Sequence, residues 1–429
     1  MSTTSTHPWG RRPRRYALAC ATAAATVLAL GACSNTAGGG SSAAQPEASA
    51  SGSFTVPEAS AEARQAAIEK GFLNKDLKYD DLNPVVQAAI NKVATPLTAA
   101  QWSKLQECLK GTSCDTGNGG KLTVGLAWDG INPWRQTSRA ETTAEAIQSP
   151  EVGKIVYSLG EDVPKLLANI NSMIAQRVDI VIINTVYGAA VLPAVQAAKN
   201  ANVAIIQVGS PLPDQVVSQL AGQASEDLCT PQTLTAEQLI KDFPKGGGYG
   251  LYTGVPGNGS AAVWQPCLTK KLDAAGWTKV IQGFTQWTEQ GMAQQGNALF
   301  ASGKNPDYIA YDYTLQDFAA PYLKAGKTPP VMGSDAENYS LLAQVKEAKS
   351  KGVDMKAYIS TGRAWFPRAG VDYGIMLKAG KKISPFMMPT GAASLESLLT
   401  NSDPAMPANA PIPTYFTAQQ EQWILSAQG

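Results

Sequence analysis

The chain has 429 residues and a formal net charge of +1, with 35 Lys and Arg residues against 34 Asp and Glu residues. Nucleic-acid binding needs a basic face, and this balance does not supply one. The sole histidine is His7, so histidine-dependent catalysis and histidine-containing zinc sites are excluded from the rest of the chain. A pair of catalytic carboxylates stays open as an enzymatic arrangement, although no motif indicates one.

The N-terminal segment has the pattern of an export signal. Four arginines between residues 11 and 15 precede an apolar run over 16–30, which ends in Leu30-Gly31-Ala32-Cys33. The last four residues resemble a bacterial lipobox, in which the signal is cleaved before the cysteine and the thiol is acylated. The resemblance implies a signal peptide over 1–32 and a lipid on Cys33 that anchors an extracytoplasmic protein to the cell membrane. The alternative is a single membrane-spanning anchor.

Two segments separate this signal from the main body. Residues 33–53 are dominated by Ser, Ala and Gly, which predicts a flexible tether. Residues 54–118 are predicted as a helical extension, in which Thr98 and Gln101 have the spacing of a capping box. Gly111 is suited to end that helix. No chemistry is assigned to this extension.

Four cysteines lie beyond Cys33, and they are Cys108, Cys114, Cys229 and Cys267. An even number outside the cytoplasm predicts disulfides, and four cysteines allow three pairings. We favour Cys108–Cys114, because these residues flank a short turn after a helix, and this leaves Cys229–Cys267. A metal cluster is the alternative, which the irregular spacing and the lack of a CxxC pair disfavour.

Strands alternate with helices from residue 121 onward. Apolar runs over 122–127, 154–157, 179–183 and 203–208 predict the first four strands. The run over 179–183 is apolar on both sides, as a buried parallel strand requires. Helices are predicted from residue 163, where apolar residues recur in steps of three, four and seven, and over 190–200. This alternation predicts a parallel α/β sheet.

The same rhythm restarts after residue 248. Five further strands are predicted, over 249–253, 279–284, 307–311, 330–333 and 356–360. Two similar blocks of alternating strands and helices indicate two similar lobes.

Specific residues give this pattern a family resemblance. Asn132-Pro133-Trp134 follows the first strand, and Gln176-Arg177-Val178-Asp179 leads into the third. This order resembles the sugar-binding, ribose-type branch of the type I periplasmic binding proteins, over about residues 120–395. The resemblance implies an α/β fold of two Rossmann-like lobes with parallel sheets and a three-segment hinge. Lobe 1 would span 119–224 and 361–388, and lobe 2 would span 225–360 and 389–418.

The second lobe carries further matches and some departures. Trp287 stands where the family often has an aromatic residue over the sugar, and Gly333-Ser334-Asp335 resembles a Gly-Phe-Asp turn. Tyr311 replaces the usual Asn beside Asp312, and Trp264 takes the place of an Arg. These departures suggest a ligand that has more apolar surface or is held mainly by stacking.

The candidate ligand-binding residues follow from this resemblance and from strand ends. Open α/β sheets bind ligands beyond the carboxyl ends of their strands. Carboxylates and amides can pair with hydroxyl groups, and an indole can cover the C–H face of a sugar ring. The predicted residues are Asp129, Trp134, Arg135, Asn184, Glu226, Trp287, Asp312, Asp335 and Trp365. Core packing is the alternative role for each Trp, and helix capping for each Asp.

One motif has the form of a dinucleotide fingerprint. Residues 257–262 read Gly-Asn-Gly-Ser-Ala-Ala between a predicted strand and helix. The acidic residue expected about 20 residues later is not convincing, because Asp273 falls within the following helix. We therefore interpret the motif as a glycine-rich turn that caps a helix, and we expect neither a cofactor nor a metal.

The sequence thus predicts a non-enzymatic, lipid-anchored binding protein for a small sugar or sugar-like molecule. The resemblance implies an ABC transporter permease as its partner, with the two lobes closing on the ligand by hinge motion. The first alternative is a ligand-sensing module of the same fold that signals to a membrane receptor. The second is an extracellular glycan hydrolase that uses carboxylates.

Overall fold

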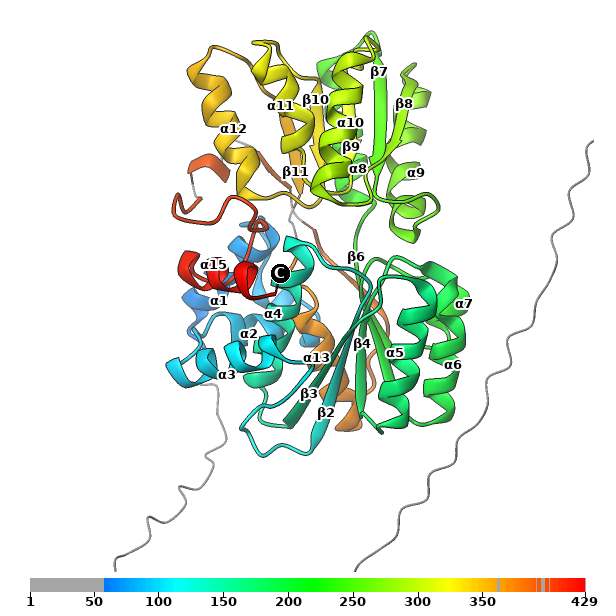
Figure 1. The fold of residues 1–429 in the computed structure, drawn as a ribbon, viewed down its shortest axis with the longest axis vertical. Helices are drawn as coiled ribbons and strands as arrows, with labels where there is room; N and C mark the ends of the chain where they lie inside the picture. The colour runs from blue at the N-terminus through cyan, green and yellow to red at the C-terminus, as the bar shows by residue number, and fades with distance from the viewer. Residues whose placement is uncertain (1–57, 361–362, 391, 395–397, 401, 429) are drawn as a thin grey trace, which may run out of the picture. The chain divides into compact units, whose positions relative to one another are not determined.

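Strands and helices alternate in the structure, a computed structural model that describes residues 58–360, 363–390, 392–394, 398–400 and 402–428. The strands form two separate sheets, which define the first and second lobes (Figure 1). The predicted signal peptide (1–32), the lipid site at Cys33 and the tether (33–53) lie outside the described residues.

The first lobe contains a seven-stranded sheet in the order β1-β3-β2-β4-β5-β6-β12. Neighbouring strands are parallel, except that β1 runs antiparallel to β3. Its strands are β1 (Ser113–Asp115), β2 (Leu122–Trp128), β3 (Val152–Leu159), β4 (Ile180–Asn184), β5 (Ala204–Gly209), β6 (Gly222–Glu226) and β12 (Phe386–Met388). Because β2 lies between β3 and β4, the strand order reverses direction at β2.

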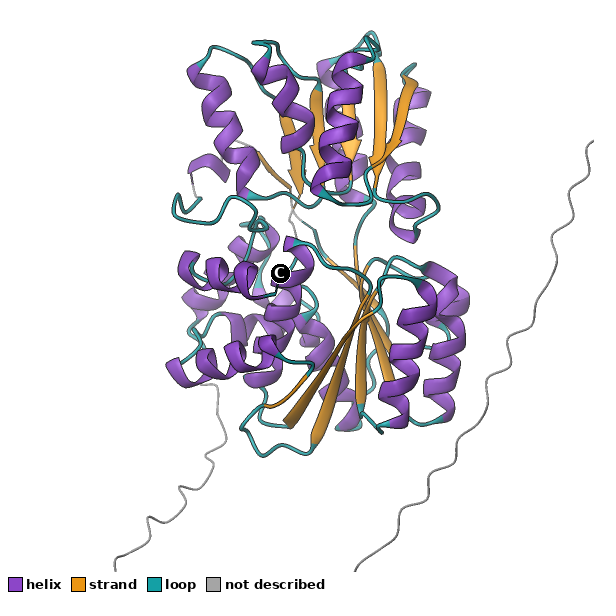
Figure 2. Ribbon diagram, in the orientation of Figure 1, coloured by secondary structure: helices purple, strands orange, loops and turns teal. Residues whose placement is uncertain are grey.

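Helices cover both faces of this sheet (Figure 2). They are α4 (Pro133–Ile147), α5 (Val163–Ala175), α6 (Leu192–Asn200), α7 (Asp214–Val217) and α13 (Arg368–Lys378). The Asp162 side chain caps α5 by accepting a hydrogen bond from the Lys165 N–H. Leu166, Ile170 and Met173 recur on one side of α5 and are buried against the sheet, as their spacing predicts. Helices α4 and α13 cover the opposite face of the sheet, where their buried side chains and those of the strands form a second core.

The second lobe repeats this plan with six strands in the order β13-β11-β10-β9-β7-β8. All its neighbouring strands are parallel except the β11–β13 pair. The strands are β7 (Gly248–Thr253), β8 (Thr278–Phe284), β9 (Tyr308–Tyr311), β10 (Val331–Ser334), β11 (Ala357–Ser360) and β13 (Ala392–Ser394). The helices are α8 (Thr230–Asp242), α9 (Gly259–Ala274), α10 (Glu289–Ala301), α11 (Gln316–Lys324) and α12 (Tyr339–Ser350). The predicted α/β fold of two lobes is confirmed.

The chain passes from one sheet to the other after β6, after β11 and between β12 and β13. A further connection comes from the C-terminal segment. The Ile412 N–H donates to the carbonyl of Glu337 in the second lobe, at 2.9 Å. Phe416 and Ile424, the latter in α15 (Ala418–Ala427), then lie in the core of the first lobe.

The predicted extension over 54–118 is helical up to Lys110 and packs onto the first lobe, whereas its last residues include β1 of the first sheet. It contains α1 (Ala61–Phe72), the short η1 (Tyr79–Asp81), α2 (Pro84–Val93) and α3 (Ala99–Lys110), whose capping box at Thr98 is formed. Lys92 of α2 pairs with Glu145 of α4, at 3.0 Å, and with Asp372 of α13. The two carboxylates hold the pKa of the buried Lys92 above its ordinary value, against the opposing effect of burial. The extension is therefore an ion-paired layer over α4 and α13.

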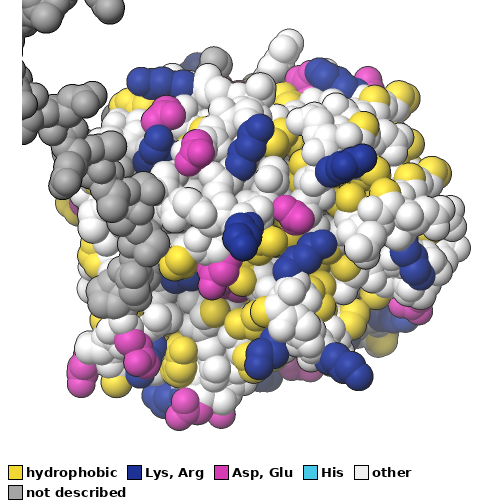
Figure 3. All heavy atoms as spheres, turned by 90° about the horizontal axis from the view of Figure 1, so that it is seen from below, with side chains coloured by type: hydrophobic (Ala, Val, Ile, Leu, Met, Phe, Trp, Pro, Cys, Tyr) yellow, Lys and Arg dark blue, Asp and Glu magenta, His cyan; other side chains and the backbone are white. Residues whose placement is uncertain are grey.

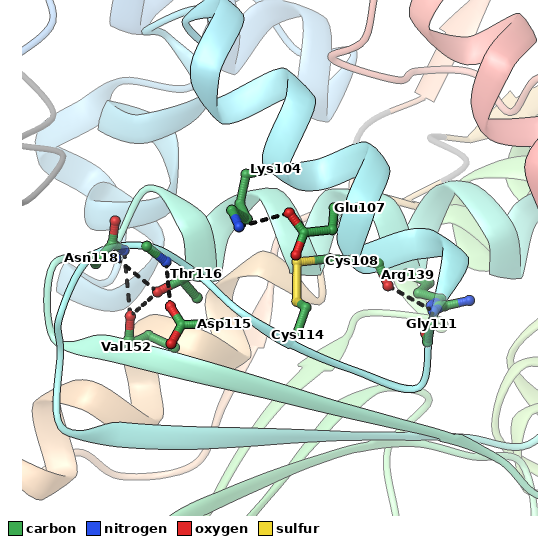
Figure 4. The surroundings of a disulfide bond; sticks show 11 residues. Lys104, Glu107, Cys108, Gly111, Cys114, Asp115, Thr116, Asn118, Arg139 and Val152 are labelled. Atoms are coloured by element: carbon green, nitrogen blue, oxygen red, sulfur yellow. Dashed lines mark hydrogen bonds and ion pairs between the residues drawn. A yellow bond between two sulfur atoms is a disulfide. The ribbon is translucent and has the colours of Figure 1, made fainter. Parts of the chain in front are cut away.

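Both favoured disulfides are present. Cys108 and Cys114 join the end of α3 to β1, and Cys229 and Cys267 join the start of α8 to α9. Figure 4 shows the first of these, with the Arg139 guanidinium donating to the Gly111 carbonyl at 2.7 Å beside it. The bond thus closes the turn between the extension and the first sheet.

Over the part of the chain that the structure describes, no helix is both long and apolar enough to cross a membrane. On the face drawn in Figure 3, Lys and Arg side chains are scattered among acidic and uncharged residues.

Candidate functional site

A cavity of about 560 Å³ is lined by loops that follow the strands of both sheets. Residues after β2 and β4 contribute from the first lobe, and residues after β8, β9 and β10 contribute from the second. These are the carboxyl ends of parallel strands, and β2 and β7 mark the points where the two strand orders reverse. Eight of the nine predicted ligand residues line it, namely Asp129, Trp134, Arg135, Asn184, Glu226, Trp287, Asp312 and Asp335.

An ion pair holds the first-lobe side of the cavity. Asp129, just after β2, accepts a hydrogen bond from the Val186 N–H at 2.6 Å. Its other oxygen lies 2.6 Å from the Arg135 guanidinium, which is also 5.0 Å from the ring centre of Trp134. Asn132 caps α4 by accepting from the Arg135 N–H, so the helix start positions both Trp134 and Arg135. The Asn-Pro-Trp turn therefore fixes an aromatic face and a paired cation at the cavity.

Asn184 ends β4 on the same side. Its side chain is buried, and its Nδ2 has no hydrogen-bond acceptor among the described residues. A Cβ on Gly209 would lie 2.9 Å from its Oδ1, so the glycine makes room for this amide. A buried amide without an acceptor carries an energetic cost that a ligand hydroxyl could relieve.

Trp287 forms part of the second-lobe side and takes an unusual backbone conformation. Its φ is 51°, and that of Gln286 is 56°, both in the left-handed region that non-glycine residues rarely adopt. A Cβ on Gly254 would lie only 2.0 Å from the indole, so the ring needs a glycine there. The indole N–H donates to Asp312 at 2.9 Å. The ring is thus held in place by a hydrogen bond at its edge.

Asp312 follows β9 and is surrounded by uncharged donors. One oxygen accepts from the Thr253 hydroxyl at 2.5 Å and from the Trp264 indole at 3.2 Å, and the other accepts from Trp287. Burial raises the pKa of Asp312 to about 7, the nearby Asp335 charge adds to the rise, and the hydrogen bonds oppose it. Asp312 is therefore a half-buried carboxyl that can gain or lose a proton near neutral pH.

Three charged residues of the cavity lining connect the lobes. Arg363, which follows β11, pairs with Glu226 at the end of β6 at 3.3 Å and with Asp335 after β10 at 3.1 Å. All three side chains are buried. Burial raises the pKa of Glu226, and the Arg363 charge opposes this rise. The φ of Arg363 is 54°, in the left-handed region that non-glycine residues rarely adopt, so the backbone that carries this guanidinium is strained.

Trp365, the ninth predicted residue, lies elsewhere. It is fully buried in the first-lobe core, where its ring centre is 5.2 Å from Phe72 and 5.3 Å from Tyr415. Its indole N–H donates to the Gly71 carbonyl at 3.0 Å. The aromatic partners of Trp365 come from the extension and from the C-terminal segment. This side chain therefore packs the extension against the first lobe and does not line the cavity.

The two departures in the second lobe also take buried positions. Trp264 is fully buried and gives its indole N–H to Asp312, and the hydroxyls of Tyr311 and Thr285 lie 2.5 Å apart. Neither Trp264 nor Tyr311 lines the cavity. Trp264 supports Asp312 and Tyr311 packs beside it, so neither side chain adds apolar surface to the site, contrary to the expectation from the sequence.

The sequence analysis missed several lining residues, among them Arg363, Tyr187 and Tyr313. Arg363 follows a predicted strand by three residues and Tyr187 follows one by four, so the strand-end rule that selected Asp129 could have found them. Tyr187 contacts the Asp129 carbonyl through its hydroxyl at 3.4 Å, and burial raises its pKa to about 12. Within the described residues, no group of His, Cys, Asp and Glu is arranged to hold a metal ion.

Comparisons with known proteins agree with this architecture. A family model described as "Periplasmic binding protein domain" matches residues 125–364. A search of curated proteins finds no match. The solved periplasmic binding protein component of a Shewanella arabinose ABC transporter, bound to L-arabinofuranose, has a TM-score of 0.58 and 15% identity, covering 71% of this chain and 98% of its own.

Two further solved structures are similar at the level of fold. An ABC transporter solute binding protein from Bacillus halodurans with bound myo-inositol has a TM-score of 0.56 at 15% identity, covering 66% of this chain and 98% of its own. A Mycobacterium smegmatis protein in complex with β-D-fucofuranose has a TM-score of 0.55 at 16% identity, covering 66% and 95%.

Proposed function

Because the chain belongs to the periplasmic binding protein domain family, we propose that it captures a sugar or sugar-like ligand outside the cytoplasm. In this proposal, the lipid on Cys33 anchors the protein to the cell membrane, and the loaded protein delivers its ligand to an ABC import permease. The first binding lobe comprises 119–224 with 361–388, and the second comprises 225–360 with most of 389–418, because Phe416 near the end of that segment packs in the first-lobe core.

The observation that carries this proposal is the cavity itself. Its volume of about 560 Å³ lies within the range of small-molecule sites. It combines the aromatic faces of Trp134 and Trp287 with polar groups from Asp129, Asn184 and Asp312. Aromatic faces suit the C–H surface of a sugar ring, and amides and carboxylates suit its hydroxyls.

The ligands named for the similar structures support the same class. They are an arabinofuranose, a fucofuranose and myo-inositol, all small polyhydroxy molecules. The chain spans nearly the whole length of each of these proteins, so the comparison includes both lobes and the site between them.

Capture follows from ligand contacts made by both lobes. Asp129 and Arg135 belong to the first lobe, and Trp287 and Asp312 belong to the second. A ligand that contacts all four favours the closed arrangement, because these contacts coexist only there. The permease would then distinguish the closed, loaded form from the open one. No bond of the ligand is made or broken.

A thermal-shift screen tests this proposal. The full chain is mixed with a panel of monosaccharides, polyols and nucleosides, and a specific ligand raises the melting temperature by mass action. We expect at least one monosaccharide or polyol to do so in a concentration-dependent way and to be recovered unchanged. If no member stabilises the protein, or if the bound sugar is consumed, the proposal is wrong.

A further inference from the structure

The cavity lining carries an excess of negative charge. Its carboxylates are Asp129, Glu161, Glu226, Asp312 and Asp335, and its cations are Arg135 and Arg363. The described lining includes neither lysine nor histidine. Glu161 is exposed and pairs with Lys165 at 3.1 Å, so solvent and this lysine screen its charge. Four carboxyl groups, of which Asp312 is half-buried and the others are buried, therefore face two guanidinium groups.

Both guanidinium groups are already engaged in ion pairs. Arg135 pairs with Asp129 at 2.6 Å, and Arg363 pairs with both Glu226 and Asp335. An anionic ligand would have to compete with these carboxylates for a cation, and its charge would add to the existing excess. Breaking a buried pair leaves an uncompensated charge, which is strongly unfavourable. The site therefore disfavours acidic ligands.

Two carboxyl groups are left without full compensation. Asp312 receives hydrogen bonds from Thr253, Trp264 and Trp287, none of which carries a charge. One oxygen of Asp335 contacts Arg363, whereas its Oδ1 is buried and has no donor among the described residues. Burial and the neighbouring Asp335 charge both raise the pKa of Asp312, and its uncharged donors oppose that rise only in part. A ligand cation would supply the missing counter-charge.

Aromatic side chains on the same lining strengthen this argument. Trp134, Tyr187, Trp287 and Tyr313 all line the cavity. Aromatic faces attract cations through their quadrupole, and more strongly where water is excluded. The Arg135 guanidinium, 5.0 Å from the ring centre of Trp134, already occupies such a position. Aromatic faces combined with excess carboxylates form an environment for a cation.

We propose that the cavity takes a polyhydroxy ligand that carries a protonated amine, an amino sugar or an amino polyol, in preference to its neutral and acidic counterparts. This inference rests on the proposed function, because it assigns a charge to the ligand of the same site. The hydroxyl groups would pair with polar groups such as Asn184, and the ammonium group would compensate the carboxyl groups of Asp312 and Asp335.

Two matched sets of probes test the charge preference at pH 7. One set is 1-amino-1-deoxysorbitol, sorbitol and gluconate, and the other is glucosamine, glucose and glucuronate. Affinities are measured by isothermal titration calorimetry on the full chain. We expect the amine of at least one set to bind about tenfold more tightly than its neutral counterpart, and the acid to show no binding.

Other outcomes overturn the inference in distinguishable ways. If a neutral probe binds as tightly as its amine, or an acid binds best, the charge preference is wrong and sugar capture stands. If none of the six probes binds and the wider sugar panel also fails, both the charge preference and the proposed function are wrong. If none of the six binds while a neutral sugar of the wider panel does, only the charge preference is wrong.

Charge-neutralising variants locate the preference within the site. Asp312→Asn and Asp335→Asn each remove a charge with little change in side-chain size, and each should reduce the amine preference about tenfold. Asp354→Asn is the matched control, because Asp354 is exposed and lies outside the cavity lining. Retention of the full amine preference in both site variants would contradict the assignment, provided that both melt cooperatively.

Discussion

Replacing Trp287 by Ala tests the placement of the ligand in the cavity. The change removes the indole face and the N–H that donates to Asp312 at 2.9 Å. If the ligand covers roughly 100 Å² of this ring, at about 25 cal/mol per Å² the loss is about 2.5 kcal/mol of binding free energy. This corresponds to an affinity about 70-fold weaker.

The same loss has a predictable thermal signature. At a ligand concentration of 100 times the wild-type Kd, binding stabilises the protein by about 2.7 kcal/mol. With an affinity about 70-fold weaker, the same concentration stabilises the variant by roughly 0.5 kcal/mol. The ligand-induced rise in melting temperature should therefore fall to about a fifth of its wild-type value in Trp287→Ala, with the best binder of the monosaccharide and polyol panel as the probe.

Two further variants separate the possible causes. Trp287→Phe keeps an aromatic face but loses the donor to Asp312, so its affinity should lie between those of wild type and Trp287→Ala. Trp423→Ala removes an indole from a cluster with Trp102, away from the cavity, and should leave the ligand-induced shift unchanged. An unchanged shift and an unchanged Kd in Trp287→Ala would remove this residue from the site.

Three further predictions concern the anchor, the extension and the pH dependence. Cys33→Ala should move the protein from the membrane fraction to the soluble fraction, and persistent membrane attachment would refute the lipid assignment. Lys92→Met should lower the free energy of unfolding by about 3 kcal/mol in denaturant titrations, because it leaves the buried Asp372 without its cation and removes one of the two cations at Glu145. The exposed Lys75→Met should change it little. Because the folded-state pKa of Asp312, about 7, lies above its unfolded value of about 3.9, this carboxyl should lower stability as the pH rises from about 4 to 7. The melting temperature of Asp312→Asn should accordingly vary less over this range, and an identical pH profile would contradict the raised pKa.

Much of the fold could be predicted because its signals are local. The run over 180–183 is apolar throughout, and its four residues form the buried start of β4. The spacing of Leu166, Ile170 and Met173 was sufficient to place the buried side of α5. Strand ends then predicted which loops would meet, because parallel strands present their carboxyl ends on one edge.

The parts that were missed depend on partners distant in sequence. Trp365 follows a strand, as a site residue would. Its indole nevertheless lies in the core, where it contacts Gly71 and Tyr415, which are distant from it and from each other in sequence. Arg363 joins the two lobes because Glu226 and Asp335, which come from two other segments of the chain, both pair with its guanidinium. The strand-end rule could have nominated Arg363 as a lining residue, but no periodicity or motif encodes its two ion pairs, which only the folded arrangement reveals.

The measurement that tests the central claim most directly is calorimetric titration of the full chain with the sugar or polyol that stabilises it best in the thermal screen. We predict saturable binding of one ligand per chain, recovery of the ligand unchanged, and strongly weakened binding in Trp287→Ala. Absence of saturable binding by any sugar or polyol, or conversion of the ligand into a product, would contradict the account.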